Sequence, residues 1–138
     1  MSARRFLDTN VLLYSISRAA DEEPKRERAI ALLEQDDCGL SVQVLQEFYV
    51  QATRAARPDA LPHDMAAGLI EAWRRFPVQD NTIAVMRGAL EIRAAHGFSY
   101  WDSAIIAAAR ALGCRELYTE DMSHGREIEG VAIINPFR

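Results

Sequence analysis

The stretch RRFLDTNVLLYSIS, residues 4–17, contains a strand signal that is directly followed by a helix signal. Arg4–Leu7 predicts a short strand, which ends at the acidic residue Asp8. The apolar residues beyond it predict a helix from Asn10 to about Ser17. A strand that leads at once into a helix is the first half of a βα unit, so this opening indicates an α/β fold.

The remaining chain continues to alternate helices and strands. Further helices are expected over Pro24–Gln35, Val42–Ala56, Pro62–Arg75, Thr82–Ala95 and Trp101–Leu112, with Asp80 as a cap before the fourth of these. Further strands are expected at Gly39–Leu40, Glu116–Thr119 and Val131–Ile134, with a brief strand or connector at Pro77–Val78. Strands separated by helices predict a three-layer sandwich, in which helices flank both faces of a mostly parallel central sheet. No repeat or linker interrupts the pattern, so residues 1–138 are expected to form a single domain.

Composition narrows the class of protein. With 138 residues and 49% hydrophobic content, the chain is long enough to bury a core. No apolar run is long enough to cross a bilayer, and the N-terminus becomes acidic too early for a signal peptide. We therefore expect a cytoplasmic protein that does not contact a membrane. Cys38 and Cys114 lie far apart and next to apolar segments, which predicts reduced, buried thiols.

The net charge of −4 argues against a protein that binds polyanions indiscriminately, because such proteins are usually basic. Of the 16 basic residues only Lys25 is a lysine. The planar guanidinium of arginine suits phosphate recognition, but a genomic bias toward arginine explains the same composition. The charge total therefore leaves nucleic-acid binding open.

Four acidic residues lie at positions where a carboxylate is unusual or where ligands commonly bind. Asp8 and Asp121 each follow a predicted strand, and ligands of open parallel sheets bind beyond the carboxyl ends of the strands. Asp102 projects from the apolar stripe of its helix, and Glu47 lies at the margin of another such stripe. Each acid alone also has an ordinary explanation, as a helix cap, a partner of the helix dipole, an amphipathic border or a loop residue.

Considered together, these acids predict a metal site. Carboxylates that meet at one edge of a sheet repel one another and raise their pKa values, unless a divalent cation lies between them. A set of ligands made only of oxygen suits Mg²⁺ or Mn²⁺ better than zinc. The three histidines do not offer an alternative, because none has a zinc-binding spacing to either cysteine.

Four short segments occur along the chain in a recognisable order: Asp-Thr-Asn at 8–10, Ser-Val-Gln-Val-Leu-Gln-Glu-Phe at 41–48, Tyr-Trp-Asp-Ser at 100–103 and Tyr-Thr-Glu-Asp at 118–121. They resemble the PIN-domain family, and most closely its VapC toxin branch. The closing Ile-Ile-Asn-Pro-Phe at 133–137 fits as well, so the resemblance extends over nearly the whole chain. It implies a PIN-like α/β sandwich with a carboxylate pocket that binds Mg²⁺ or Mn²⁺ and hydrolyses RNA.

The resemblance also implies a role for each acid. The four metal-binding and catalytic acids correspond, in order, to Asp8, Glu47, Asp102 and Asp121. Thr9 and Asn10 match the polar residues that support the first acid. Because Glu120 precedes Asp121, either residue or both can take the role of the fourth acid. A metal held by carboxylates turns water into hydroxide and holds the scissile phosphate, so no side-chain nucleophile is needed. Arginines of the outer helices are candidates for holding the RNA backbone, although a solvated helix face explains each of them equally well: Arg54, Arg57, Arg74 and Arg75.

Partners follow from the same resemblance. It implies the toxin of a toxin–antitoxin pair, whose cognate antitoxin blocks the acidic pocket with a cation. A homodimer is expected, in which the helix Pro62–Arg75 supplies apolar side chains to the core or to the interface: Met65, Leu69, Ile70 and Trp73. The RNA substrate is expected to be a structured loop of tRNA or ribosomal RNA, because an acidic protein gains little from non-specific phosphate contacts.

Two other functions are compatible with this fold. In the first, a Mg²⁺-dependent phosphatase uses Asp8 as the phosphorylated residue. That chemistry calls for a second aspartate two positions later, where this chain has Asn10. In the second, a non-catalytic PIN-like module only binds RNA or a protein partner, and the presence of all four acids disfavours it.

Overall fold

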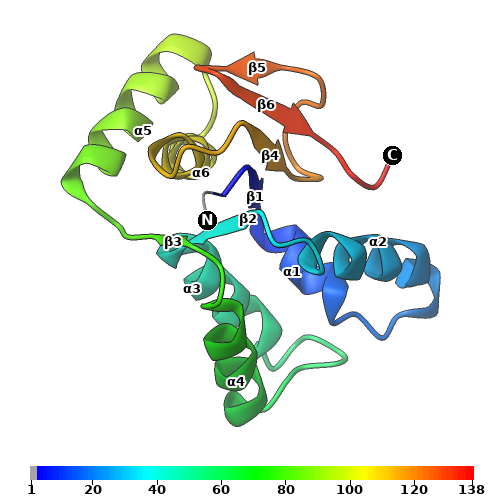
Figure 1. The fold of residues 1–138 in the computed structure, drawn as a ribbon. Helices are drawn as coiled ribbons and strands as arrows, with labels where there is room; N and C mark the ends of the chain where they lie inside the picture. The colour runs from blue at the N-terminus through cyan, green and yellow to red at the C-terminus, as the bar shows by residue number, and fades with distance from the viewer. Residues whose placement is uncertain (1–2) are drawn as a thin grey trace.

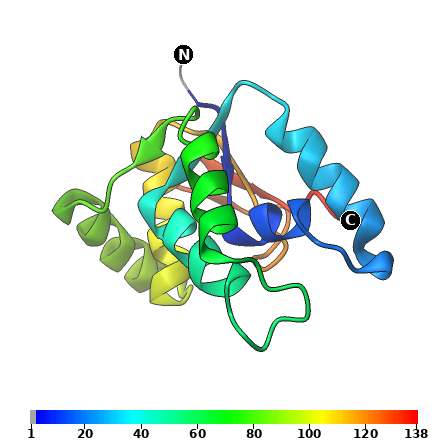
Figure 2. The same ribbon diagram turned by 90° about the horizontal axis from the view of Figure 1, so that it is seen from below.

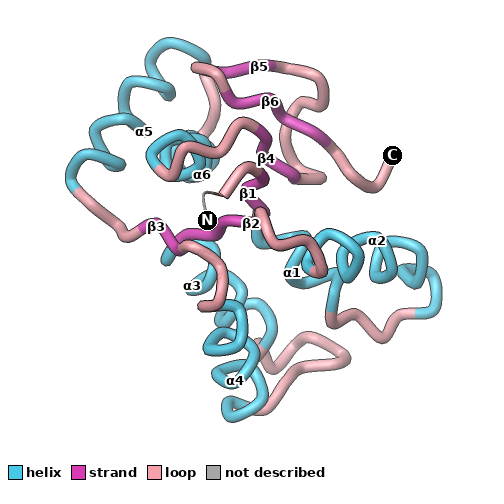
Figure 3. Tube along the Cα trace, in the orientation of Figure 1, coloured by secondary structure: helices cyan, strands magenta, loops and turns pink. Residues whose placement is uncertain are grey.

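A six-stranded sheet lies at the centre of the computed structural model, which describes residues 3–138 (Figures 1 and 3). In chain order the strands are β1 (Arg5–Leu7), β2 (Cys38–Ser41), β3 (Val78–Gln79), β4 (Glu116–Tyr118), β5 (Glu127–Ile128) and β6 (Val131–Ile134). Their spatial order is β3-β2-β1-β4-β6-β5. All neighbouring strands are parallel except β5 and β6, which are antiparallel. The mostly parallel sheet that the sequence predicts is confirmed.

Helices cover both faces of this sheet. They are α1 (Thr9–Ser15), α2 (Glu23–Leu33), α3 (Val42–Ala52), α4 (His63–Trp73), α5 (Ile83–His96) and α6 (Tyr100–Ala111), with a short 3-10 helix at Ala20–Glu22. Helix α6 packs against β2, β3, β4 and β6 and carries α5 on its outer side, whereas α1 to α4 lie on the opposite face (Figure 1). Figure 2 shows α3 and α4 side by side, with their connecting loop projecting beyond them. The predicted three-layer α/β sandwich is therefore confirmed.

Polar side chains determine where several helices begin. Asp8, Ser41 and Ser99 stand immediately before α1, α3 and α6, and each accepts a hydrogen bond from a backbone amide of the first turn. Thr82 caps α5 in the same way, accepting from the amide of Val85 at 3.1 Å. The prediction that Asp80 caps this helix is wrong, because Thr82 is next to the first helical residue and already satisfies the free amide.

Four helices end two or more residues before the predicted position, namely α1, α2, α3 and α4, and contacts near the ends of α1 and α3 show where the chain turns. Helix α1 ends at Ser15 rather than Ser17, and the Ser17 hydroxyl donates instead to Glu22 Oε1 at 2.5 Å. Helix α3 ends at Ala52 rather than Ala56. There the carbonyl of Ala52 accepts a hydrogen bond of 2.8 Å from the amide of Leu61, as the chain turns back toward α4.

The short strand β5 is absent from the sequence prediction. It has only two residues, and it joins β6 through a two-residue turn at Glu129 and Gly130. Both turn residues have positive φ, 53° and 88°, as the tight hairpin turn that matches strand twist requires. The apolar alternation that identifies longer strands is too brief here to be recognised.

The central strand β1 brings the candidate site to one edge of the sheet. Phe6 and Leu7 are fully buried, and Leu7 is paired in parallel with Tyr118 of β4. The residues that follow these two strands therefore emerge next to each other. Cys38 and Cys114 are free and buried, as predicted. No helix within residues 3–138 has the length and apolar content needed to cross a membrane.

Candidate functional site

Asp8 lies at the junction between β1 and α1, where only 7% of the residue is exposed. Its Oδ1 accepts a hydrogen bond from the amide of Thr9 at 2.7 Å. Its Oδ2 accepts from the hydroxyl of Thr119 at 2.8 Å, and Thr119 is the residue that follows β4. The parallel pairing of β1 and β4 thus brings together two side chains that are 111 positions apart.

Burial raises the pKa of the Asp8 carboxyl from 3.8 to about 6, because the charged form loses its water. The hydrogen bonds from Thr119 and Thr9 act in the opposite direction, but they do not outweigh burial. The negative charges of Glu47 and Asp121 raise the pKa of Asp8 further. A buried carboxylate with two acidic neighbours is an arrangement that a cation stabilises.

Glu47 is half-buried on α3, and both of its carboxylate oxygens are held by neighbouring side chains. Thr9 donates its hydroxyl to Glu47 Oε2 at 2.9 Å. Gln43, one helical turn earlier, donates Nε2 to Glu47 Oε1 at 3.0 Å and to the carbonyl of Trp101 at 3.4 Å. Glu47 therefore has a defined orientation toward the start of α1, and Gln43 connects it to α6.

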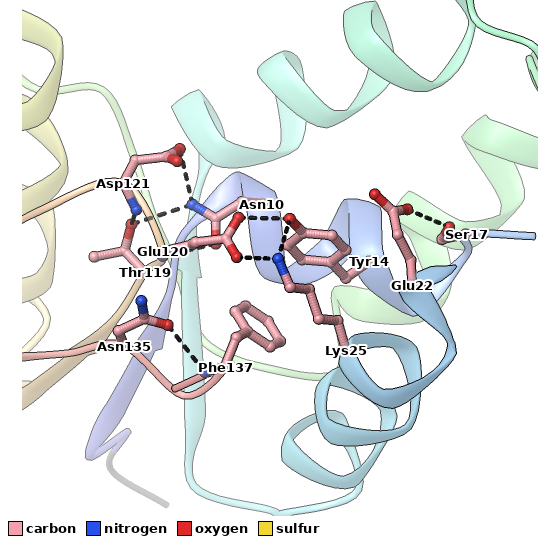
Figure 4. Close-up of polar contacts among 10 residues, drawn as sticks. All are labelled: Asn10, Tyr14, Ser17, Glu22, Lys25, Thr119, Glu120, Asp121, Asn135 and Phe137. Carbon is pink, nitrogen blue, oxygen red and sulfur yellow. Dashed lines mark hydrogen bonds and ion pairs between the residues drawn. The ribbon is translucent and has the colours of Figure 1, made fainter. Parts of the chain in front are cut away.

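Asp121 and Thr119 are bridged by the amide side chain of Asn10 (Figure 4). Asn10 donates Nδ2 to Asp121 Oδ2 and to Thr119 Oγ1, both at 3.1 Å. Its Oδ1 accepts a hydrogen bond of 3.2 Å from the backbone amide of Glu120. The side chain of Asn10 thus connects α1 to the segment after β4 and holds Asp121 in place.

Asp102 lies in the first turn of α6, where its backbone amide donates to the capping hydroxyl of Ser99 at 3.2 Å. Burial raises the pKa of the Asp102 carboxyl, while hydrogen bonding with Ser99 lowers it. The charges of Asp121 and Glu47 also raise this pKa. The charges of Glu47 and Asp121 therefore act on both Asp8 and Asp102.

The side chain of Glu120 points away from Asp121 and toward Tyr14 and Lys25 (Figure 4). It forms an ion pair of 2.6 Å with Lys25 of α2 and accepts a hydrogen bond of 2.5 Å from the hydroxyl of Tyr14. Partial burial acts to raise the pKa of Glu120, but the contacts with Lys25 and Tyr14 prevail and lower it. Glu120 is therefore occupied in a separate contact, and Asp121 is the member of this pair that remains beside Asn10.

The four acids offer donors that suit Mg²⁺ or Mn²⁺ in kind. All are carboxylate oxygens, and within residues 3–138 no lysine, arginine or histidine forms an ion pair with any of the four. The described part of the chain holds no group of three acidic, histidine or cysteine side chains close enough to enclose an ion. The fit therefore rests on the chemistry of the donors and on their shared negative charge.

Two residues of this network are missing from the sequence analysis. Thr119 donates to Asp8, and Gln43 orients Glu47. Thr119 directly follows a predicted strand, so the strand-end argument that identified Asp121 applies to it as well. Gln43 has no such signal, because its role depends on the approach of α3 to α6.

Most of the arginines considered for RNA binding are engaged in contacts within the protein. Arg57 pairs with Asp59 at 2.8 Å, and Arg74 pairs with Glu71 at 3.2 Å. Arg75 donates to two backbone carbonyls and lies over the ring of Phe76. Arg54 is exposed. These contacts weaken the hypothesis that the outer-helix arginines hold the RNA backbone.

Comparison with known proteins agrees with this architecture. The model of the PIN-domain family matches residues 5–126. No curated protein sequence matches the chain significantly.

Several solved structures share the fold at low sequence identity. A toxin–antitoxin complex from Klebsiella pneumoniae has a chain with 20% identity and a TM-score of 0.71, and the match covers 98% of both chains. A sarcin-ricin loop cleaving toxin from Mycobacterium tuberculosis has 20% identity and a TM-score of 0.66, covering 85% of this chain and 91% of that one. FitAcB from Neisseria gonorrhoeae has 21% identity and a TM-score of 0.65, covering 96% and 98%.

Proposed function

The chain belongs to the PIN-domain family, and from this premise we propose that it is a metal-dependent endoribonuclease that acts as the toxin of a toxin–antitoxin pair. One observation supports the nuclease proposal above the others. The buried carboxyl of Asp8 lies in the field of Glu47 and Asp121, and no basic side chain in residues 3–138 is paired with these acids. Buried carboxylates without a positive partner lower the stability of the fold. With a divalent cation between them, the same carboxylates serve as its ligands.

In this proposal Asp8, Glu47, Asp102 and Asp121 hold the metal and are the catalytic acids. Bound Mg²⁺ or Mn²⁺ supplies a Lewis acid that activates water and offsets the charge of the scissile phosphate. The protein contributes orientation: Thr9 donates to Glu47, Thr119 donates to Asp8, and Asn10 donates to Asp121. Fixed first-turn and strand-end positions keep these donors in place without a rearrangement during the reaction.

The test is cleavage of RNA by the purified protein with Mn²⁺, and again with excess EDTA. We expect cleavage that EDTA abolishes and that Asp8→Asn reduces by orders of magnitude, since the carboxylate that binds the metal is lost. Asp64→Asn is the matched control, because Asp64 is an exposed acid on α4. Cleavage that survives complete chelation contradicts the proposed metal role.

The proposed partner is a cognate antitoxin that directs an arginine or lysine at the acidic pocket. This proposal is supported by the toxin–antitoxin complex from Klebsiella pneumoniae, which contains a chain with a similar fold. We expect the neighbouring upstream gene to encode a small protein that copurifies with this chain and inhibits cleavage. Copurification without inhibition places the partner on another surface and rejects the pocket-blocking mode.

We also propose a homodimer. Of the residues considered for it on α4, Trp73 is 5% exposed and belongs to the core, whereas Met65 is 51% exposed. Val50 on α3, which packs against α4, is 57% exposed, so apolar surface remains on this side of the molecule. Sedimentation at micromolar concentration should give a dimer, and a monomer there rejects the proposal.

The proposed substrate is a structured loop in tRNA or ribosomal RNA. The acidic net charge of −4 supports selectivity by shape over general binding to phosphates. Sequencing of RNA ends from cells that express the chain should reveal one dominant cleavage site. Cleavage spread evenly over transcripts contradicts this selectivity and leaves the nuclease proposal intact.

A further inference from the structure

Trp101 is the only exposed residue among the phenylalanines, tyrosines and tryptophans of residues 3–138, with 64% of the residue exposed. The other tryptophan, Trp73, is 5% exposed and packs edge to face against Phe48. A single exposed apolar residue is common on protein surfaces, so exposure alone does not imply a function. The position of Trp101, directly before Asp102 in the first turn of α6, is what distinguishes it.

The ring and the backbone carbonyl of Trp101 each have a neighbour in the fold. Its ring packs edge to face against Tyr100, with centroids 5.0 Å apart and an interplanar angle of 77°. Its carbonyl accepts a hydrogen bond from Gln43, which also donates to Glu47. Successive residues of a helix point about 100° apart, so the side chains of Trp101 and Asp102 leave neighbouring sides of α6. Trp101 is therefore an exposed aromatic surface on the first turn of α6, directly before Asp102 and linked through Gln43 to Glu47.

RNA that approaches the four acids is repelled by their charge, and an aromatic surface offers a contact that this repulsion does not weaken. The four acids repel phosphate, and the whole chain carries a net charge of −4. Apart from the phosphate that the metal holds, much of the binding energy must therefore come from contacts that do not depend on positive charge. Stacking of an unpaired base on an aromatic ring is such a contact, and every base can take part in it.

We propose that Trp101 is a stacking site for an unpaired nucleobase next to the phosphodiester that is hydrolysed at the acids. This inference rests on the proposed ribonuclease function and adds the residue that holds the substrate. It assigns Trp101 to substrate binding and leaves the metal to the carboxylates.

Binding can be measured in Asp8→Asn protein with Mg²⁺, using a short single-stranded oligoribonucleotide that this variant leaves intact. RNA should quench tryptophan fluorescence, because the only other tryptophan is buried. Trp101→Phe should abolish the quenching and keep most of the affinity. Trp101→Ala should weaken binding by roughly 5- to 100-fold, the range expected for one lost base–aromatic stack.

The same substitutions in the active protein separate binding from catalysis. Trp101→Ala should raise KM by a similar factor with little change in kcat, and Trp101→Phe should restore KM. Ile83→Ala is the matched control, because Ile83 is 68% exposed on α5 and should leave binding and KM unchanged.

Two results overturn the inference. In one, Trp101→Ala binds RNA as tightly as its parent. In the other, Trp101→Ala converts a dimer into a monomer in sedimentation, which places the indole against a second copy of the chain. If the wild type fails to cleave RNA with Mn²⁺, the ribonuclease proposal fails on that measurement, and the quenching experiment still decides whether Trp101 stacks with a base.

Discussion

At the scale of single residues, the buried carboxyl of Asp8 lowers the stability of the folded protein when it is charged. Its pKa is about 6 in the folded chain, against 3.8 for an ordinary aspartate. Well below pH 4 the carboxyl is protonated in both folded and unfolded states, so burial costs little there. As the pH rises from about 4 to 6, the unfolded state releases this proton more readily, and the folded state loses about 3 kcal/mol.

Asp8→Asn should therefore stabilise the metal-free protein at neutral pH. We expect the free energy of unfolding at pH 7 in EDTA to rise by about 1–3 kcal/mol, because the buried charge is removed while an amide still accepts one of the two hydrogen bonds. Urea denaturation at pH 4 and pH 7 measures the effect, and the gain should nearly vanish at pH 4. A variant that is less stable than the wild type at pH 7 contradicts this account of Asp8.

At the scale of elements, the contact between Lys25 and Glu120 joins helix α2 to the segment after β4 (Figure 4). Tyr14 of α1 donates to the same carboxylate and packs edge to face against Phe137 near the C-terminus. The backbone amide of Glu120 in turn donates to Asn10, which bonds to Asp121. The direction taken by Glu120 thus influences the position of the neighbouring acid.

A charge exchange tests this coupling. Lys25→Glu and Glu120→Lys should each weaken Mn²⁺ binding by roughly tenfold, as substitutions in the support of a metal ligand commonly do. The double variant, which restores an opposite pair, should recover most of the affinity. Mn²⁺ titration in the absence of RNA provides the measurement, with Lys25→Arg as the conservative control. Single variants that bind Mn²⁺ as tightly as the wild type show that the pair only stabilises the fold.

Sequence reasoning predicted the elements well where local signals are strong. Helices with a polar cap, such as the one that Ser41 begins, start where they were expected. The strand β5 was missed because two residues carry too little pattern, and the end of α3 depends on a contact with Leu61. The strand-end rule singled out Asp8 and the segment containing Asp121. It could not reveal contacts such as Gln43 with Trp101, which exist only once α3 and α6 are packed together.

At the scale of the whole molecule, charge limits how RNA can be bound. The chain has 20 acidic and 16 basic residues. Among the basic ones, Lys25, Arg57 and Arg74 already pair with acids of the same chain. Because the acidic residues outnumber the basic ones, the affinity for RNA should depend on shape and stacking more than on charge.

This argument predicts a weak dependence of RNA binding on salt. A protein that neutralises 6–10 phosphates loses about 10³- to 10⁵-fold in affinity between 50 and 200 mM salt, because each contact releases counterions. For the Asp8→Asn protein and a single-stranded oligoribonucleotide we expect a loss of less than roughly tenfold over that range, corresponding to about two phosphate contacts. Titration at several salt concentrations gives the slope directly. A steep slope shows that arginines dominate binding, since base stacking on Trp101 involves no release of counterions and should persist at the higher salt.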